Sequence, residues 1–419
     1  MSTWAQVGYT DQTYTALQTM WKAKTDAETQ KALDMYEAAF AQFPDSLDAW
    51  SVYKSAVLAG RLKELDKAFG YLDKLWKLLE SDQTGWEYWI GDYVKGDYEN
   101  LIGDARWTSQ YERATEARGA FFKELAEAET EFRQEAEWQA DTSVSPEKLY
   151  AQLQHGPPFL TKQEQDYSLR FAFNDTAQTS YFVHLPADYD PARRYPLLFF
   201  LHGAVFHNKL ADYQTRDQVL TGWNRYYAKY AAANEVIMVF PQGSKEFNWM
   251  RPDDGFRMVP DILREIRRVI NVDEDRVFIT GHSNGATGSF SYWMKDPTPF
   301  AGFFGFNTFP RVFTGGTFIQ NGRNRSFVNF STDQDYYYPP WANDSMSQLT
   351  GKLDIAYEDI RYEGFPHWFP EFDESEPAYK ILFERIEQVR RPAFPDTIYW
   401  ALDDPAYNQA DWLIVSEMD

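Results

Sequence analysis

Apolar positions in the first third of the chain recur three and four residues apart. From about residue 11 to residue 140, Ala, Leu, Glu and Lys are frequent and prolines are few. This spacing gathers the apolar side chains on one face of each of several successive helices. Individual helices are predicted over residues 62–79, 86–98 and 109–138. The pattern predicts an all-α helical-hairpin domain over residues 1–145.

Small and aromatic residues around Pro44 have the spacing at which two paired helices of a tetratricopeptide repeat pack together. Ala32, Tyr36 and Ala39 occupy the small, aromatic and small positions, and Trp50 begins the next helix at the expected offset. This segment resembles a tetratricopeptide repeat, and the pair of helices that follows matches it less well. We predict a tetratricopeptide-like domain with one recognisable repeat. A helical bundle that only packs against the next domain is the alternative.

The periodicity changes after a polar break at residues 141–146 (DTSVSP). Short β-type runs follow at residues 167–173, 179–185, 197–201, 236–240, 277–280 and 326–330. Helical stretches such as 217–233 and 257–270 separate most of these runs. Strands that alternate with helices predict an α/β domain with a mostly parallel sheet, which we place at residues 146–394. Residues 395–419 form a C-terminal extension, in which segments 397–401 and 411–415 are candidates for a small β hairpin.

The composition narrows the choice of partner and chemistry. With 25% charged and 44% hydrophobic residues, the 419-residue chain is long enough for two or three globular domains. Its net charge of −22 argues against nucleic acid and anionic membranes as partners. The absence of cysteine excludes disulfides, thiolate metal sites and a cysteine nucleophile. Aromatic residues reach 18%, more than a core needs, and are candidates to line a binding cleft.

The start of the chain has neither a basic run nor an apolar stretch, so the pattern of a secretory signal peptide is not expected there. No apolar run approaches the roughly 18 residues that a membrane span needs. The compartment stays open between the cytoplasm and a mature secreted or periplasmic protein.

The strongest chemical signal is the pattern Gly-x-Ser-x-Gly at Gly281, Ser283 and Gly285. A predicted strand precedes it and small residues that open a helix follow it. A serine on such a sharp strand-to-helix turn projects its hydroxyl above the sheet, and glycines on either side leave room for the turn. Ser283 is therefore the predicted nucleophile.

A serine nucleophile needs a histidine as general base and an acid that orients this histidine. Of the six histidines, His367 follows the late β-like run 354–362, where the last member of a serine–acid–histidine order falls. The loop after the strand at 326–330 offers two acids, Asp333 and Asp335.

The oxyanion that forms on attack needs two preorganised donors, which are usually backbone N–H groups. The sequence Leu201-His202-Gly203-Ala204 directly follows an apolar strand, at the position of an oxyanion loop. We assign the donors to the N–H groups of Ala204 and Asn284, with the N–H of Val205 as the near alternative to that of Ala204. For His202 we expect an ordering role in this loop and a place beside the substrate.

Together these motifs resemble the α/β-hydrolase serine esterases, in the branch that contains polyhydroxyalkanoate-depolymerase-like, feruloyl-esterase-like and predicted-peptidase sequences. The resemblance covers about residues 167–390, including YFVHLPADYDPARRYPLLFFLHG and NVDEDRVFITGHSNG. The chain has Ala286 where this branch usually has a second glycine. In this branch a hydrophobic residue and a proline commonly follow the acid, as Tyr338 and Pro339 follow Asp335, so Asp335 is preferred and Asp333 is the fallback. The resemblance implies no metal and no organic cofactor.

The predicted activity is that of a carboxylic-ester hydrolase of the EC 3.1.1 type, which works through an acyl-enzyme intermediate. Aromatic loops suggest acylated carbohydrate or phenolic esters as substrates, with His202, Tyr336, Trp341 and Trp368 as candidate pocket residues. A serine peptidase of the same fold is the first alternative. The second is an interaction scaffold with a vestigial hydrolase domain, and the helical domain is in any case a candidate surface for a protein partner.

Overall fold

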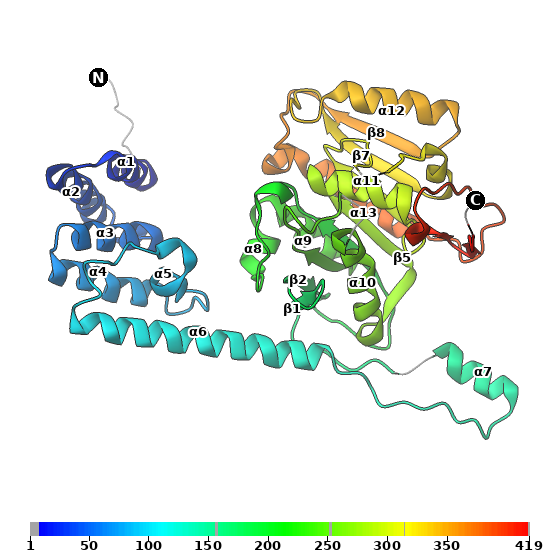
Figure 1. Cartoon of the computed structure of the whole chain (residues 1–419), viewed down its shortest axis with the longest axis horizontal. Helices are drawn as coiled ribbons and strands as arrows, with labels where there is room; N and C mark the ends of the chain where they lie inside the picture. Colours follow the sequence, from blue (N-terminus) through cyan, green and yellow to red (C-terminus); the bar gives the residue numbers. More distant parts are fainter. Residues whose placement is uncertain (1–7, 156–157, 251–253, 314, 418–419) are drawn as a thin grey trace. The chain divides into compact units, whose positions relative to one another are not determined.

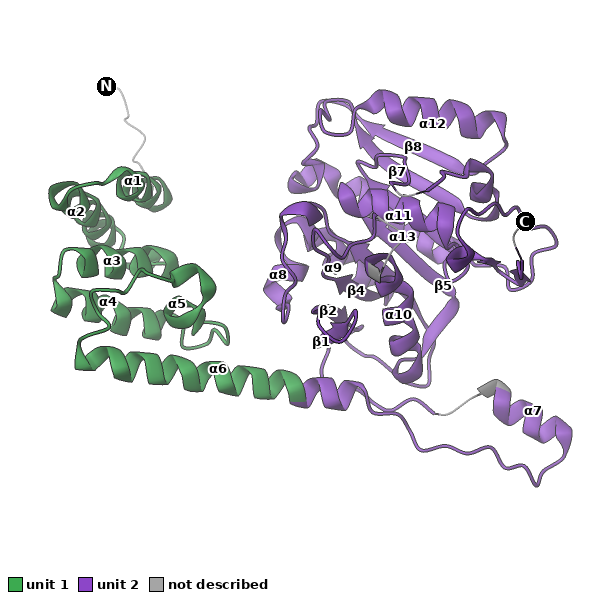
Figure 2. Ribbon diagram, in the orientation of Figure 1, with its two compact units in different colours: residues 1–126 green, residues 127–419 purple. Residues whose placement is uncertain are grey.

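The computed structural model describes residues 8–155, 158–250, 254–313 and 315–417 (Figure 1). It divides into two compact units, Met1–Ala126 and Glu127–Asp419 (Figure 2). This division lies inside helix α6 (Ala105–Phe132), upstream of the boundary at 145/146 that the polar break suggests. The difference arises because the end of α6 packs with the second unit, where Phe132 belongs to the main core. Residues 1–7, which carry part of the signal-peptide prediction, lie outside the described residues.

The first unit consists of helices joined by short turns, which confirms the all-α prediction for this part of the chain. Its helices are α1 (Tyr9–Lys22), α2 (Asp26–Gln42), α3 (Ala49–Arg61), α4 (Leu65–Leu78), α5 (Glu87–Ile90) and the greater part of α6. Helix α1 packs on α2, and α3 packs on α4. Ala32, Tyr36 and Ala39 of α2 are all buried, so the small-aromatic-small face points inward. The tetratricopeptide-like character of these hairpins stays a prediction.

Local sequence signals fix the helix ends in this unit. Helix α2 begins at Thr25, whose hydroxyl accepts the Glu28 N–H at 3.3 Å while the Glu28 carboxylate accepts the Thr25 N–H at 3.0 Å. This reciprocal capping satisfies two of the backbone donors that a helix start leaves unpaired. The helix predicted over residues 86–98 is shorter in the structure, because α5 ends at Gly91. There an added Cβ would lie 2.5 Å from the Glu87 carbonyl oxygen.

The second unit is built on an eight-stranded sheet with the order β1-β2-β4-β3-β5-β6-β7-β8. The strands are β1 (Asp166–Ala172), β2 (Gln178–His184), β3 (Tyr195–Leu201), β4 (Ile237–Pro241), β5 (Val272–Gly281), β6 (Gly302–Phe306), β7 (Ser326–Thr332) and β8 (Tyr357–Tyr362). Strands β1 and β2 pair antiparallel, as do β2 and β4, and every later neighbour pairs in parallel. The prediction of a mostly parallel α/β sheet is confirmed.

Helices cover both faces of this sheet. They are α8 (Arg216–Leu220), α9 (Arg225–Asn234), α10 (Asp254–Val269), α11 (Asn284–Lys295), α12 (Pro340–Lys352) and α13 (Glu376–Gln388). Helix α7 (Pro146–His155) precedes the sheet in the chain. Leu197 and Leu198 of β3 belong to two different core clusters, since adjacent strand residues point to opposite faces. One cluster includes side chains of α10, α11 and α12, and the other includes side chains of α9 and α13. The central strands are therefore buried on both sides, as a parallel sheet requires.

Three segments differ from the sequence analysis. Residues 302–306 (GFFGF), which are not among the predicted strands, form the buried central strand β6. The single helix predicted over 217–233 is divided into α8 and α9 around Gly222, whose φ of +54° interrupts the helix. In the C-terminal extension, the hairpin pairs β9 (Gln409–Ala410) with β10 (Leu413–Ile414), so residues 397–401 are not one of its strands.

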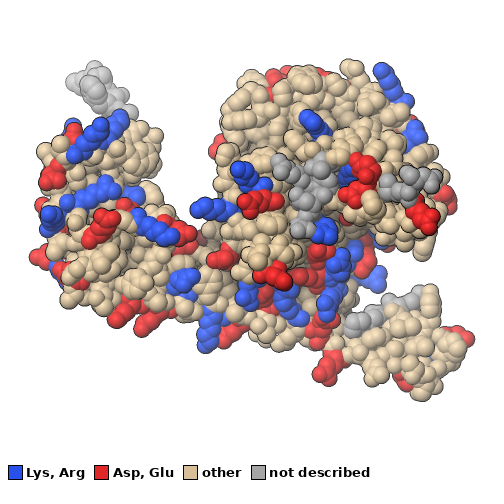
Figure 3. Space-filling view, in the orientation of Figure 1, with Lys and Arg blue, Asp and Glu red and all other residues tan. Residues whose placement is uncertain are grey.

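Among the described helices, none combines the length and the apolar character that crossing a membrane requires. On the face shown in Figure 3, Lys and Arg side chains lie among Asp and Glu side chains on both units. This face therefore presents charges of both signs.

Candidate active site

The turn between β5 and α11 holds Ser283 in a strained backbone conformation, with φ of +58° and ψ of −118°. Both glycines of the motif are sterically required. A Cβ on Gly281 would lie 2.4 Å from the backbone of Gly285, and a Cβ on Gly285 would lie 1.8 Å from the Leu201 carbonyl oxygen. The Ser283 N–H donates to the Phe306 carbonyl at 3.0 Å, which ties the turn to strand β6. The hydroxyl is thus presented at the carboxyl end of the sheet, as the motif predicts.

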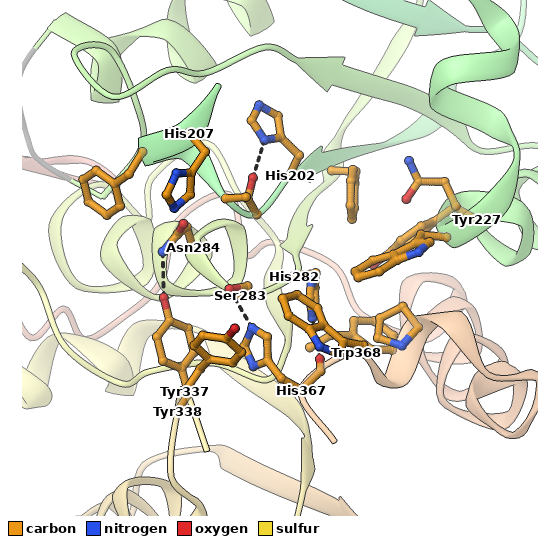
Figure 4. A pocket seen from close by; sticks show the side chains of 18 of the residues that line it. His202, His207, Tyr227, His282, Ser283, Asn284, Tyr337, Tyr338, His367 and Trp368 are labelled. Carbon is orange, nitrogen blue, oxygen red and sulfur yellow. Dashed lines mark hydrogen bonds between the residues drawn. The ribbon is translucent and has the colours of Figure 1, made fainter. Parts of the chain in front are cut away.

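The side chains of Ser283, His367 and Asp335 form a continuous hydrogen-bonded chain, of which Figure 4 shows the contact between Ser283 and His367. His367 Nε2 lies 2.8 Å from Ser283 Oγ, and His367 Nδ1 lies 2.7 Å from Asp335 Oδ2. The His367 and Asp335 side chains are 2% and 1% exposed. A carboxylate at Nδ1 fixes the ring so that Nε2 faces the serine, which is the geometry of a general base beside its nucleophile.

Further hydrogen bonds hold the Asp335 carboxylate in place. Its Oδ1 accepts the N–H groups of Tyr337 and Tyr338 at 2.9 and 2.8 Å, and its Oδ2 accepts the Asn307 amide at 2.9 Å. Asp333 lies elsewhere, and its carboxylate accepts the exposed Gly364 N–H at 2.7 Å. The structure therefore places Asp335, not Asp333, at the histidine.

A second buried histidine supports the loop that carries His367. His282 Nε2 lies 2.8 Å from the backbone carbonyl oxygen of His367, so this nitrogen carries a proton and donates it. Burial, together with the nearby His367, lowers the pKa of His282 to about 3, which keeps the ring neutral at neutral pH. Trp223 packs edge-on against the His282 ring, with centroids 5.4 Å apart. The sequence argument had assigned His282 no such contact.

The predicted oxyanion loop follows β3 and turns sharply at Ala204, whose φ is +56°. The N–H of the next residue, Val205, donates to Asn284 Oδ1 at 3.2 Å, and Asn284 Nδ2 donates to the Tyr338 hydroxyl at 2.7 Å. The Asn284 side chain thus links the oxyanion loop to the acid loop. Because this contact occupies the Val205 N–H, the N–H groups of Ala204 and Asn284 remain the candidates for the oxyanion.

His202 orders the loop on its other side. Its Nε2 accepts the Gly243 N–H at 3.0 Å, and its Nδ1 lies 2.7 Å from the Gly203 carbonyl oxygen. Burial lowers the pKa of His202 to about 4, so the ring is neutral at neutral pH and donates through Nδ1. His202 faces away from Ser283 in Figure 4, so its contacts are those of an ordering residue.

A cavity of about 520 Å³ opens above the serine. Aromatic rings form most of its wall, among them Phe200, Trp223, Tyr227, Tyr337 and Trp368. None of the described residues that line it is Asp, Glu, Lys or Arg. The wall of the cavity therefore suits an uncharged, largely apolar group.

Two of the four predicted pocket residues line this cavity, namely His202 and Trp368. The other two, Tyr336 and Trp341, are outside its lining and are 69% and 64% exposed. Tyr336 instead stacks on Tyr337, with ring centroids 4.1 Å apart, and Tyr337 is the ring that reaches the cavity. Sequence reasoning found the right loop but not which of its tyrosines points inward.

No group of three or more His, Asp or Glu side chains within the described residues is arranged to hold a metal ion.

Residues 176–309 match the Esterase family model. This match lies within the second unit. The match covers the oxyanion loop and the serine turn, and it confirms the predicted resemblance to serine esterases. The comparison with curated proteins gives no match.

Solved structures similar to the chain include several esterases. A thermostable esterase is 21% identical, with 54% of this chain and 64% of that chain covered and a TM-score of 0.44. A ferulic acid esterase is 17% identical over 53% of this chain and 99% of that chain, with a TM-score of 0.42. Thermogutta terrifontis esterase 2 is 14% identical over 54% of this chain and 94% of that chain, with a TM-score of 0.42.

Three residues of the second unit that sequence reasoning did not place at the site are Trp223, Tyr227 and Tyr337. Trp223 and Tyr227 come from the segment around α9, far from the motifs in the sequence. No spacing rule connects them with Ser283, and only the fold brings them to the cavity. For Tyr337 the signal was present, because it follows the preferred acid by two residues.

Proposed function

We propose that the second unit hydrolyses carboxylic esters through a covalent acyl-enzyme on Ser283. The observation that carries this proposal is the unbroken chain of hydrogen bonds from Ser283 through His367 to Asp335, set beneath an apolar cavity. The family match over residues 176–309 supports the same chemistry.

In the proposed mechanism, His367 Nε2 takes the Ser283 proton as the serine oxygen attacks the ester carbonyl carbon. The N–H groups of Ala204 and Asn284 stabilise the oxyanion, where the loss of one donor costs about 3 kcal/mol. The imidazolium, stabilised by Asp335, then protonates the alcohol oxygen as the ester C–O bond breaks. A water molecule, deprotonated by His367, attacks the acyl-enzyme and releases the acid.

The cavity favours an aromatic or other apolar acyl group, for example a phenolic acid. Rings such as Tyr337 and Trp368 offer stacking surfaces, and no charged side chain of the described lining is placed to pair with a charged substrate group. A peptidase that recognises charged chain ends or charged side chains would need such partners. This absence from the described wall favours the esterase over the peptidase alternative.

The nucleophile is tested with Ser283→Ala on p-nitrophenyl acetate and butyrate. We expect kcat to fall by at least about 10⁴-fold with the fold unchanged by circular dichroism, because the variant has no oxygen that can form the acyl-enzyme. Equal rates for the variant and the wild type would overturn the serine mechanism and leave the scaffold alternative.

The acid is tested with two substitutions that make the same chemical change at neighbouring positions. Asp335→Asn should lower kcat by about 10⁴-fold, because an amide at His367 Nδ1 favours the wrong tautomer. The matched control Asp333→Asn should stay within about threefold of the wild type, since this carboxylate accepts the Gly364 N–H and not a proton of His367. The reverse order of effects would assign the acid to Asp333.

The peptidase alternative is tested with amides that share the acyl group of a cleaved ester. We expect hydrolysis of the ester and very little hydrolysis of the matched anilide or short peptide. Comparable kcat/KM values for ester and amide would overturn the preference for an esterase over a peptidase.

A further inference from the structure

Asn284 follows the nucleophile in the chain, and its side-chain amide is held at both ends. Its Oδ1 accepts the Val205 N–H at 3.2 Å, and its Nδ2 donates to the Tyr338 hydroxyl at 2.7 Å. The first contact fixes the orientation of the amide, because a backbone N–H can only donate and therefore needs the carbonyl oxygen. The Tyr338 oxygen then faces the NH₂ group and acts as the acceptor. Figure 4 shows this contact beside Ser283.

Tyr338 is also connected to the acid and the base of the reaction site. Its backbone N–H donates to the Asp335 carboxylate at 2.8 Å. Its ring lines the catalytic cavity and lies at 88° to the His367 ring, with centroids 5.2 Å apart. Burial raises the pKa of the Tyr338 hydroxyl above its ordinary value of about 10, so the phenol keeps its proton at neutral pH. Among these contacts, the one with Asn284 is made by the hydroxyl.

The oxyanion loop has a strained backbone at Ala204, whose φ is +56° and ψ is +27°. Residues with a Cβ rarely adopt this left-handed conformation. Both polar ends of the peptide group that follows Ala204 are held. Its carbonyl oxygen accepts the His207 N–H at 2.9 Å, and its N–H, which belongs to Val205, donates to Asn284. The contact with Asn284 therefore helps to keep the turn in its strained conformation.

The two N–H groups assigned to the oxyanion have no other use in the described part of the chain. No hydrogen bond within the described residues starts from the N–H of Ala204 or from that of Asn284. Unpaired N–H groups beside the nucleophile are available to a substrate oxygen. Asn284 thus contributes twice, because its N–H is one donor and its side chain holds the loop that carries the other.

We propose that the Tyr338 hydroxyl is a positioning group for the oxyanion site, which acts through the Asn284 side chain and rests on the proposed esterase function. The hydroxyl holds the amide, and the amide holds the Val205 N–H. This contact keeps the turn in the conformation that presents the Ala204 N–H to the oxyanion. Without the hydroxyl, the amide is free to rotate and to release the Val205 N–H. The donors then lose the preorganisation on which stabilisation of the oxyanion depends.

The first test is Tyr338→Phe, which removes the hydroxyl and keeps the ring and the backbone N–H. We expect kcat on p-nitrophenyl butyrate to fall about 10- to 50-fold while KM stays within about twofold, because the oxyanion forms only during the reaction. The pH profile of kcat/KM should keep its shape, since the hydrogen bonds between Ser283, His367 and Asp335 are unaltered. Equal kcat values for the variant and the wild type, or a shifted pH profile, would overturn the proposal.

The matched control for this test is Tyr336→Phe, in the same loop. Tyr336 is 69% exposed and lies outside the lining of the catalytic cavity. Its kcat should stay within about twofold of the wild-type value. Circular dichroism of both variants shows whether the fold is kept.

The second test uses a trifluoromethyl ketone, which probes the oxyanion site without turnover. Ser283 attacks its carbonyl carbon, the serine proton passes to His367, and the carbonyl oxygen becomes an oxyanion in a reversible adduct. We expect its Ki to rise in Tyr338→Phe by about the factor by which kcat/KM falls, because the adduct resembles the transition state. The matched methyl ketone, which forms little adduct, should keep its Ki within about twofold. An unchanged Ki for the trifluoromethyl ketone, or equal rises for both ketones, would overturn the proposal.

A double variant separates an action through Asn284 from a direct one. The Tyr338 hydroxyl also interacts with the Ser283 hydroxyl, so a direct effect on the nucleophile is the alternative. Asn284→Ala keeps the backbone N–H and removes the amide, and its kcat should fall at least as far as that of Tyr338→Phe. Adding Tyr338→Phe to Asn284→Ala should then lower kcat by less than about twofold more, because the amide is already absent. Losses that multiply would assign the hydroxyl a direct role and overturn the proposal.

The positioning role and the esterase function fail in different ways. If the wild type hydrolyses no ester, the esterase function fails and the positioning role fails with it. If the wild type hydrolyses p-nitrophenyl butyrate in a Ser283-dependent way and Tyr338→Phe is equally active, the esterase function stands and the positioning role fails.

Discussion

At the scale of single residues, His282 is the neighbour of the nucleophile whose contacts say most about catalysis. Its ring is not part of the chain of hydrogen bonds from Ser283 through His367 to Asp335. It donates instead to the His367 carbonyl at 2.8 Å, and so fixes the backbone that carries the general base. His282 is therefore a positioning residue, which acts through His367.

Replacing His282 by alanine leaves the His367 carbonyl without this donor. We expect kcat to fall about 10- to 100-fold, in keeping with about 1–3 kcal/mol for a lost buried hydrogen bond, while KM changes little. His282→Gln, whose amide NH₂ can reach the same carbonyl, should recover part of the loss. Steady-state kinetics on p-nitrophenyl butyrate, with the pH profile of kcat, measure this. A loss of stability with kcat intact would show that His282 is only a core residue.

The two neutral histidines also make stability depend on pH. The pKa values of His202 and His282 in the folded chain, about 4 and about 3, lie below the roughly 6.5 of an unfolded histidine. As the pH falls below about 6.5, the unfolded state binds protons that the folded state does not. Each histidine then lowers the free energy of unfolding by up to about 1.4 kcal/mol per pH unit until its folded pKa is reached.

Urea unfolding between pH 7 and pH 4.5 measures this slope. As the pH falls, the free energy of unfolding should decline less steeply for His282→Gln than for the wild type. His207→Gln removes an exposed histidine and should follow the wild-type slope. If the free energy of unfolding fell equally with pH in the wild type, His282→Gln and His207→Gln, the result would contradict the assignment of the acid sensitivity to buried neutral histidines.

At the scale of elements, the sequence was most informative where a signal is local. Gly281 and Gly285 predicted the serine turn because no larger residue fits there, whatever the rest of the chain does. Strand β6 was missed because its run GFFGF is short, does not alternate and contains two glycines. Its strand character comes from pairing between β5 and β7, which no local pattern reports. The choice of Tyr337 over Tyr336 at the cavity depends in the same way on tertiary contacts.

The C-terminal extension is an element whose role only the structure reveals. Its carboxylates pair with two cations that lie almost fully inside the hydrolase unit, Asp411 with Arg325 and Asp403 with Lys295. The side chains of Arg325 and Lys295 are 2% and 3% exposed. A buried cation without an opposite charge costs free energy. The two ion pairs therefore hold the extension on the second unit.

Asp411→Asn should therefore lower the free energy of unfolding by about 3–5 kcal/mol. Asn accepts the positive φ of this position, 50°, so backbone strain does not contribute. The double variant Asp411→Asn with Arg325→Met should recover much of this loss, because no buried charge remains. Glu384→Gln breaks an exposed pair with Lys380 and should cost less than about 1 kcal/mol. Equal losses in the Asp411 and Glu384 variants, measured by urea unfolding, would contradict the argument.

At the scale of the whole molecule, the chemistry and the stacked helices belong to different compact units. The catalytic cavity is lined by residues of Glu127–Asp419. The helical unit has a core of its own, in which residues such as Leu33, Tyr53 and Leu72 are buried. The chain has a net charge of −22, yet the described wall of its catalytic cavity contains no Asp, Glu, Lys or Arg.

This separation predicts that the second unit hydrolyses esters without the first unit. A chain that begins at Glu127 keeps the end of α6, including Phe132 in the core and Glu129, which pairs with Arg170. We expect its kcat/KM on p-nitrophenyl butyrate to lie within about twofold of the full chain, because domains with their own cores fold and act independently. A tenfold or larger loss, with the shortened chain folded by circular dichroism, would show that the helical unit supplies part of the reaction site. If the loss is confined to acylated sugars, the helices take part in binding the substrate and not in the chemistry at Ser283.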